Sequence, residues 1–345
     1  MLKPFDPVIN ELIQARKDRP HIRFNVRYER HLEALLPHLS AMKNTVVTHR
    51  NRGIVRLALD DTAGALEDLE MCLFLCRGLS IEPGWLISHL VALATHNISM
   101  QLIFNGLSTR KWNETQLAVI EKELSQFDWL ALYHHTMRAD RNMCLAFFQE
   151  MARNRLRAQK KFENYWWGDM PIAVLWAPGA LRKNQNKLGR LYDERAFALV
   201  NLKTRTVDVR LAKHFELHPF ESKHLNEVLA SESFFGPERI APKTARAQVA
   251  NDLARLAVAL ERHRRAEGDY PEKLAALAPR FLAKIPHDVM NGKPLNYKRL
   301  NDDYLLYSVG QNLRDDGGLI VEKDYHAGDI RWFAKPKPQP KPKAE

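Results

Sequence analysis

Helical periodicity runs through almost all of residues 10–155 and constrains this chain more than any other feature of its sequence. Within Ala63–Leu79, apolar residues recur at three- and four-residue spacing, which places them on one face of a helix. That stripe consists of Ala65, Leu66, Leu69, Cys72, Leu73 and Cys76. Because helices with one apolar face must bury it against each other, the sequence predicts an antiparallel helical bundle or a short solenoid.

A helical hairpin is expected early in this region. The turn residues 60–62 (DDT) interrupt a helix over Asn44–Leu59 and supply side chains that cap the next helix. Small residues at Gly53 and Ala65 stand where a tetratricopeptide-type (TPR-like) hairpin brings its two helices into close contact. No second copy follows at the period of about 34 residues typical of that repeat, so a regular array is not expected.

Capping signals mark the helices that follow. A proline opens the helix expected over Pro83–Ile103. Asn113 and Gln116 form a capping box for a helix that reaches Gln126. Asp128 then caps a long helix, so the bundle is predicted to continue to the end of the periodic region.

The middle of the chain has a different character. The segment FENYWWGDMPIAVLWAP, residues 162–178, holds three tryptophans together with Gly and Pro. We interpret them as packing between helices rather than as a ligand platform, because buried aromatic rings stabilise through their area alone. A helix is expected again over Asn186–Leu202, followed by an irregular connection to Pro242 that contains a short helix in HPFESKHLNEVLAS.

A strongly amphipathic helix is predicted over Lys243–Ala266, and Gly268 ends it. Its last turns carry the cluster RHRR, residues 262–265. This cluster could hold a phosphate or a nucleic acid. The preferred interpretation is that its cations complement the negative end of the helix dipole.

Two alternating segments, Leu295–Arg299 and Tyr304–Val309, are joined by Leu300-Asn301-Asp302-Asp303 and predict a β-hairpin. The expected fold is therefore mainly α with a small α+β C-terminal domain, and each part is expected to have its own core. The predicted parts are an α-helical domain (1–202), an irregular connection (203–242), a helix-plus-sheet domain (243–333) and a disordered Lys/Pro tail (334–345).

Three consecutive motifs occupy residues 244–332. They are ARAQVANDLARLAVALERHRRAEGDYPEKLAALAP, then IPHDVMNGKPLNYKR, then DYLLYSVGQNLRDDGG followed by GDIRW. In order and spacing they resemble the soluble helix, the Gly-x-Pro-x-x-Tyr segment and the final strands and loop of the major pseudopilins of type II secretion systems. The resemblance covers about a quarter of the chain and implies a long helix packed on an antiparallel sheet.

The helical region contains the pattern LDDTAGALEDLEMCLFLCRGLSIEPGWLISHLV. Over residues 10–201 it is similar to the N-terminal part of uncharacterised planctomycete and verrucomicrobial proteins that end in a pseudopilin-like domain. Those proteins often begin with a membrane anchor, which this sequence lacks, so a trimmed anchor is one interpretation. The resemblance implies a membrane-associated place in the cell envelope, outside the cytoplasm.

Pseudopilin loops of this kind bind calcium through aspartates and backbone carbonyl groups. The resemblance implies Asn312, Asp315, Asp316 and Asp329 as the ligands here. Ca²⁺ takes six to eight oxygens and would relieve the repulsion between adjacent carboxylates. Asn312 departs from the aspartate usual in pseudopilins, which weakens the site. The alternative is a turn without metal over residues 315–318, in which glycines supply positive φ and aspartates bond their own backbone.

Signatures of catalysis are missing from the sequence. It contains no HExxH, GxSxG, Walker or GxGxxG motif. His134 and His135 are adjacent, so on a helix they point about 100° apart and cannot both face one site. Cys72, Cys76 and Cys144 are odd in number and have no CxxC spacing, so we interpret them as buried thiols.

The net charge of +11 at pH 7 permits binding to an anionic surface but does not demonstrate it. The tail 335–345 contributes four lysines against one glutamate. No apolar run reaches the roughly 18–20 residues that a membrane-spanning helix needs, and the N-terminal segment has no apolar signal core.

Three functions remain open from the sequence. The preferred one is a non-enzymatic, envelope-associated scaffold or interaction protein that binds a protein partner and has a calcium-stabilised C-terminal domain. The second is an enzyme of unrecognised class, which a pocket lined by converging ionisable side chains would favour. The third is a binder of nucleic acid or another anionic polymer, which a continuous basic face would favour, although nucleic acid is the less expected partner.

Overall fold

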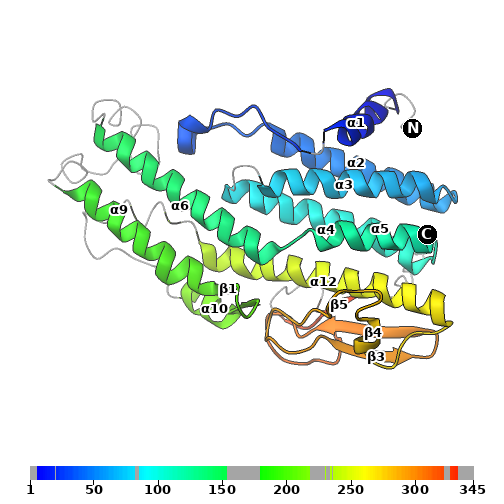
Figure 1. Ribbon diagram of the computed structural model, residues 1–345. Coiled ribbons are helices and arrows are strands. Elements are labelled where there is room, and N and C mark those ends of the chain that lie inside the picture. Colours follow the sequence, from blue (N-terminus) through cyan, green and yellow to red (C-terminus); the bar gives the residue numbers. More distant parts are fainter. Residues whose placement is uncertain are drawn as a thin grey trace, which may run out of the picture.

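The computed structural model describes residues 6–19, 21–81, 85–153, 179–217, 230, 234, 236–321 and 327–332. Within these ranges helices dominate, and two small antiparallel sheets lie in the C-terminal half (Figure 1). The chain is therefore mainly α with a small α+β C-terminal domain, which confirms the predicted fold class.

The helices are α1 (Asp6–Asp18), α2 (His38–Ala58), α3 (Thr62–Ile81), α4 (Leu86–Ser108), α5 (Glu114–Ser125), α6 (Trp129–Arg153), α9 (Ala180–Leu191), α10 (Val209–Leu217) and α12 (Pro237–Glu267). Short 3-10 or π-helical turns are η2 (Tyr28–Glu33), η3 (Tyr192–Ala196), η4 (Phe197–Leu199) and η6 (Leu274–Leu277). The strands are β1 (Val200–Asn201), β2 (Thr206–Val207), β3 (Asn296–Leu300), β4 (Asp303–Ser308) and β5 (Ile330–Trp332).

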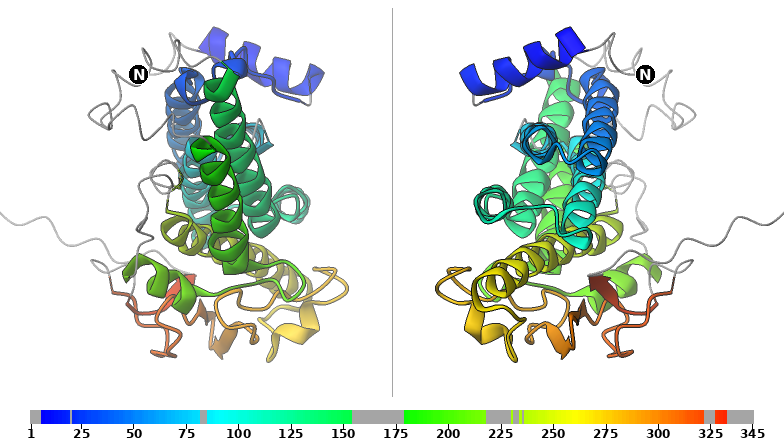
Figure 2. Two further views of the ribbon diagram at one scale, coloured as in Figure 1. Left: turned by 90° about the vertical axis from the view of Figure 1, so that its left-hand side faces the viewer. Right: turned by 90° about the vertical axis from the view of Figure 1, so that its right-hand side faces the viewer.

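The helices are stacked in layers on the three-stranded sheet. Helices α2 and α3 pack on α4, helices α4 and α5 pack on α12, and α12 lies against β4 and β5. Figure 1 shows α12 between the upper helices and the sheet, and both turned views in Figure 2 agree. One long helix therefore forms a wall of the helical bundle and also supports the sheet.

Helices α2 and α3 form the predicted hairpin, and small residues stand at its contact. Ala65 is completely buried. A Cβ atom at Gly53 would lie 2.5 Å from Leu102 Cδ2 on α4 and 3.4 Å from Asp68 Cβ on α3. Glycine therefore lets three helices approach one another at this point.

The predicted caps of α5 and α6 are present. Gln116 N donates to Asn113 Oδ1 at 2.9 Å, and Asn113 N donates to Gln116 Oε1 at 3.0 Å, which completes the capping box. Ala131 N donates to Asp128 Oδ1 at 3.1 Å at the start of α6. These side chains satisfy backbone donors that the first helical turn leaves free.

Helix α12 begins at Pro237, before the predicted start at Lys243. Proline is favoured in the first turn because it has no N–H group to satisfy, which suits Pro237. Pro242 lies inside the helix and leaves the carbonyl four residues before it without an intrahelical N–H donor. Gly268 ends the helix as predicted, with φ of +88° and its N–H donating to Arg264 O at 2.9 Å.

The predicted hairpin of β3 and β4 is confirmed, with Leu300 paired to Asp303 across the turn. Strand β5 pairs antiparallel with β4 and gives the order β3-β4-β5. Leu306 is completely buried, and the ring of Trp332 meets Phe104 of α4 edge to face with 6.0 Å between centroids. The sheet thus joins the helical core directly.

The prediction of separate cores for the two parts is wrong. One cluster of buried apolar residues extends from Leu39 to Trp332 and includes residues of α4, α6, α12 and the sheet. A second, smaller cluster lies beneath α1 and includes Ile9, Met71 and Cys72. The domain boundaries at residues 202 and 243 themselves stay predictions.

The segment after α6 differs from its predicted form. The helix expected over Asn186–Leu202 ends at Leu191, and a π-helical turn, a 3-10 turn and the small β1–β2 hairpin follow. Helix α10 occupies part of the connection expected to be irregular. The aromatic segment 162–178, most of HPFESKHLNEVLAS and the tail 334–345 lie outside the described residues.

Within the described ranges, α4 is the one helix long and apolar enough to cross a membrane. Its most apolar window is 56% buried inside the protein, where it contacts α2, α3 and α12. Its apolar character is accounted for by this central position, so the described residues contain no clear membrane span.

Candidate functional site

The loop after β4 folds back on itself before β5. Its two arms are joined by a hydrogen bond of 2.8 Å from Asp329 N to Leu319 O and by a bridge between Ile320 and Gly328. Gly310 has φ of +67°, and a Cβ atom there would collide with the carbonyl oxygen of Gly328. Glycine is therefore required where the two arms meet.

Asp329 organises this loop from its interior. Its side chain is buried, and Oδ2 accepts hydrogen bonds from Gly318 N at 2.6 Å and Asp316 N at 3.1 Å. The other oxygen, Oδ1, has no hydrogen-bond partner among the described residues. Burial raises the pKa of Asp329, the two backbone bonds lower it, and the charges of Asp316 and Asp315 raise it further.

The other three candidates lie in the same loop, and of these Asp316 contacts the Asp329 carboxylate through its backbone N–H. Asp315 Oδ1 accepts from Tyr307 Oη at 2.9 Å and from Gly317 N at 3.0 Å. Asn312 Nδ2 donates to Asp316 Oδ2 at 2.7 Å. Gly317 and Gly318 have φ of +70° and +84°. The residues form a turn with the glycine and aspartate chemistry expected of one.

The structure thus brings Asn312, Asp315, Asp316 and Asp329 into one hydrogen-bonded loop. Across the described ranges, no three His, Cys, Asp or Glu side chains converge closely enough to be recognised as a metal-binding group. Calcium binding in this loop stays a prediction.

The histidines and cysteines considered above have structural surroundings. His134 Nε2 lies 2.7 Å from Val200 O, whereas His135 is exposed, so the two point apart. All three cysteines are buried thiols outside any disulfide, as predicted. Burial raises the pKa of Cys76 to about 12, and its thiol donates to Ala92 O, so it is not a nucleophile at neutral pH.

A buried ionic cluster at the α2–α3 contact was missed in the sequence. Asp68 is completely buried and lies 2.6 Å from His49 Nδ1, 2.7 Å from Arg52 Nη2 and 3.1 Å from Arg56 Nη1. The signal that could have revealed it is the spacing of these three basic residues, which places them on one face of α2. Each donor ties α2 to α3, so the cluster is structural.

Polar side chains also cross the buried contact between α4 and α12. His89 Nε2 lies 3.0 Å from Thr244 Oγ1, and His96 Nε2 donates to Asn251 Oδ1 at 3.2 Å. The seven-residue spacing of the histidines repeats in the partners, which places both pairs on matching faces of the two helices. These contacts fix how α12 sits on α4.

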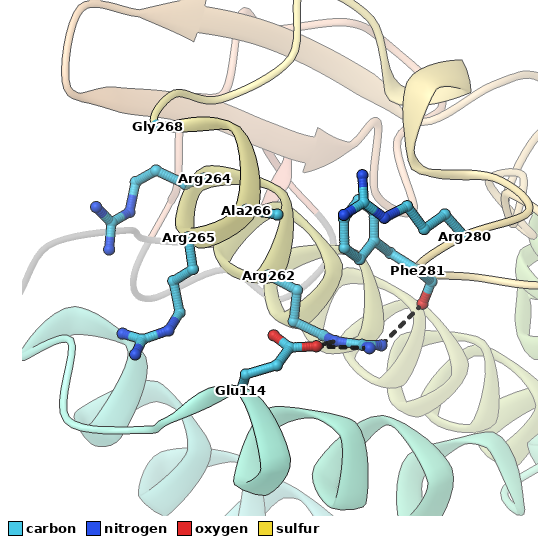
Figure 3. A pocket seen from close by; sticks show the side chains of 8 residues that line it. All are labelled: Glu114, Arg262, Arg264, Arg265, Ala266, Gly268, Arg280 and Phe281. Carbon is cyan, nitrogen blue, oxygen red and sulfur yellow. Dashed lines mark hydrogen bonds and ion pairs between the residues drawn. The ribbon is translucent and has the colours of Figure 1, made fainter.

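A basic pocket lies between the end of α12, the start of α5 and the loop after η6. Its volume is about 610 Å³, and its lining includes Arg262, Arg264, Arg265, Arg280, Glu114 and Phe281 (Figure 3). Arg262 Nη2 lies 2.7 Å from Glu114 Oε1, and the guanidinium groups of Arg262 and Arg280 lie 5.5 and 4.9 Å from the Phe281 ring centroid. Four arginines thus line one cavity, and three of them are paired with a glutamate: Glu114, Glu261 or Glu267.

Comparison with known proteins adds no relative: no protein-family model, curated protein or solved structure matches this chain.

Proposed function

We propose that this protein is a non-enzymatic interaction scaffold whose C-terminal loop binds Ca²⁺. The helical layers would present a surface to a protein partner, and the ion would hold the loop between β4 and β5 in one conformation. The envelope location proposed for it depends on the resemblance of residues 244–332 to pseudopilins.

The observation that supports the cation is the buried Asp329 carboxylate. Its Oδ1 lacks a hydrogen-bond partner among the described residues, and leaving a buried acceptor unpaired costs about 1–3 kcal/mol. Oxygens of Asp315, Asp316 and Asn312 belong to the same loop. A hard cation that prefers carboxylate and carbonyl oxygens suits this set, and water or backbone oxygens would complete its coordination.

The lining of the basic pocket supports a role without catalysis. Its cations are arginines, which stay protonated in proteins and cannot act as general bases. The carboxylate in the lining, Glu114, is paired with Arg262. These lining residues therefore do not provide a general base and a general acid, which weighs against the hypothesis that the protein is an enzyme.

Calcium should raise the melting temperature of the protein. An ion that binds only the folded state stabilises it by about 2.7 kcal/mol at 100 times its dissociation constant. Magnesium should have a smaller effect because it demands a smaller, octahedral site. The measurement is thermal unfolding with EDTA, Ca²⁺ or Mg²⁺ at constant ionic strength.

The informative variant is Asp329→Asn, because its amide oxygen can still accept from Gly318 N and Asp316 N while the charge is removed. It should stay folded and lose the response to calcium. The matched control, Asp302→Asn, changes an exposed turn aspartate and should keep the response. An unmoved wild-type melting curve, or equal responses in both variants, would leave the loop as a turn without metal.

A further inference from the structure

We propose that the basic pocket binds a phosphate group carried by a small molecule. The pocket is separate from the loop between β4 and β5, and the proposal is independent of calcium binding there. Three arginines at the end of α12 line the pocket, and the loop after η6 adds a fourth.

The helix dipole explains only part of this arrangement. Cations at the C-terminal end of a helix complement its negative end, which accounts for Arg264 and Arg265. It does not account for Arg280, which comes from a different segment and lines the same cavity. The negative end of α12 is also opposed by the positive end of α5, because Glu114 is the first residue of α5 and lines the pocket.

Two of the arginines are held in place before any ligand arrives. Arg262 bonds Glu114 and donates to Phe281 O at 3.4 Å, and its guanidinium lies over the Phe281 ring. Arg264 makes two hydrogen bonds to Glu261, at 2.6 and 2.9 Å. Such preorganised groups lose little conformational freedom when an anion binds.

The other two arginines are available to a ligand. Arg265 is exposed and makes no hydrogen bond or ion pair with the described residues, and Figure 3 shows it extending from α12 toward the start of α5. Arg280 pairs with Glu267, but both side chains are largely exposed, and water screens such pairs so that they contribute little stability. An incoming dianion can therefore replace Glu267 at little cost.

The chemistry of the lining selects an oxyanion. All four cations are arginines, whose planar guanidinium groups match phosphate oxygens in pairs. A volume of about 610 Å³ falls within the range of about 300–1,000 Å³ of small-molecule pockets. It exceeds what a single phosphate fills, so the ligand carries a further group. The four arginines belong to two neighbouring segments around one cavity, so we expect a small molecule rather than an extended polymer.

The test is calorimetric titration of the full chain with pyrophosphate at moderate salt. Arg265→Gln and Arg280→Gln should each weaken binding at least about tenfold, which corresponds to about 1.4 kcal/mol. The matched control is Arg210→Gln, since Arg210 is also an exposed helical arginine but lies on α10. It should bind like the wild type, and circular dichroism should show that all variants are folded.

Comparing pyrophosphate with a second probe, phosphatidate vesicles, identifies the source of the phosphate. Binding to phosphatidate vesicles that depends on Arg265 but not on Arg210 would support the site and assign it to a lipid headgroup. Pyrophosphate binding with the same dependence would support it and assign it to a soluble ligand. The proposal is overturned if neither probe shows this dependence, or if all three variants weaken binding to single-stranded DNA and pyrophosphate equally, because diffuse charge would then suffice. Asp329→Asn should leave pyrophosphate binding unchanged, which separates this test from that of the calcium loop.

Discussion

At the scale of single residues, the buried ionisable groups between the helices decide how the protein responds to pH. Burial lowers the pKa of both His89 and His96 to about 4. Burial raises the pKa of Asp140 and of Asp252 to about 6, while hydrogen bonds from Tyr192 and from Gln248 act in the opposite direction. Relative to the unfolded chain, folding therefore favours the neutral form of all four groups.

The buried histidines and the buried aspartates change the stability of the protein in opposite directions as the pH changes. Stability that the neutral histidines contribute is present above their unfolded pKa of about 6.5 and is lost as the pH falls toward about 4. Stability that the protonated aspartates contribute is present at low pH and is lost as the pH rises through about 6. The stability of the wild type should therefore depend only weakly on pH between about pH 4 and about pH 6.

The substitution Asp252→Asn should separate the contribution of the aspartates to the pH dependence of stability from that of the histidines. The raised pKa of Asp252 corresponds to a cost of about 3 kcal/mol at neutral pH, and we expect the variant to recover about 1–2 kcal/mol because the amide is still desolvated. Below about pH 6 the stability difference between variant and wild type should shrink. The stability of the variant should then fall more steeply with decreasing pH than that of the wild type, because the histidines become protonated.

The measurement is urea unfolding of the wild type and variant at about pH 7.5 and about pH 5. Asp302→Asn, in the exposed turn between β3 and β4, serves as the control and should follow the wild type. A lower stability of Asp252→Asn at the higher pH would show that the carboxylate is needed in its charged form.

At the scale of elements, the contact between helices depends on where glycine permits a close approach. Gly53 lies in the middle of α2, where glycine costs about 1 kcal/mol relative to alanine. The neighbouring Leu102 is completely buried, so it has little room to move away from an added methyl group. The gain in helix propensity and the cost of overpacking therefore oppose each other at this position.

Gly53→Ala should destabilise the protein by about 1–2 kcal/mol, because overpacking a filled core costs about 1–3 kcal/mol and exceeds the gain in propensity. The matched control is Gly189→Ala on α9, where the added Cβ would meet no described atom within 4 Å beyond the nearby backbone of its own helix. That change should be neutral or stabilise by up to about 1 kcal/mol. Chemical denaturation checks both, and equal effects of the two substitutions would contradict the close contact at Gly53.

Local signals in the sequence account for most of the elements. The capping box at Asn113, the cap at Asp128 and the stop at Gly268 act within a few residues, so they could be predicted directly. Strands β1 and β2 have two residues each, too few for an alternating pattern to appear. The aspartate–glycine turn was foreseeable for the same local reason, whereas the burial of Asp329 depends on how the loop folds back.

At the scale of the whole molecule, contacts distant in sequence escaped prediction. Glu114 and Arg262 are 148 residues apart and meet only because α5 packs on α12. Periodicity shows that α12 has an apolar face but does not show which partners cover it. The same packing explains why the protein has one main core where two separate cores were predicted: α12 contributes buried residues to contacts with α4, α5 and α6.

This arrangement changes what cleavage in the connection 203–242 should do. Helix α12 buries Leu253, Leu256 and Leu260 in the same cluster as residues of α4 and α6. If the chain is cut before α12, separating the pieces would expose apolar surface on both of them, at about 25 cal/mol per Å². We therefore expect the cut pieces to stay together in native size-exclusion chromatography and to unfold in one transition. A folded fragment of α12 and the sheet that elutes alone would instead support two independent domains, because it would show that the contact of α12 with the sheet is sufficient without α4 and α6.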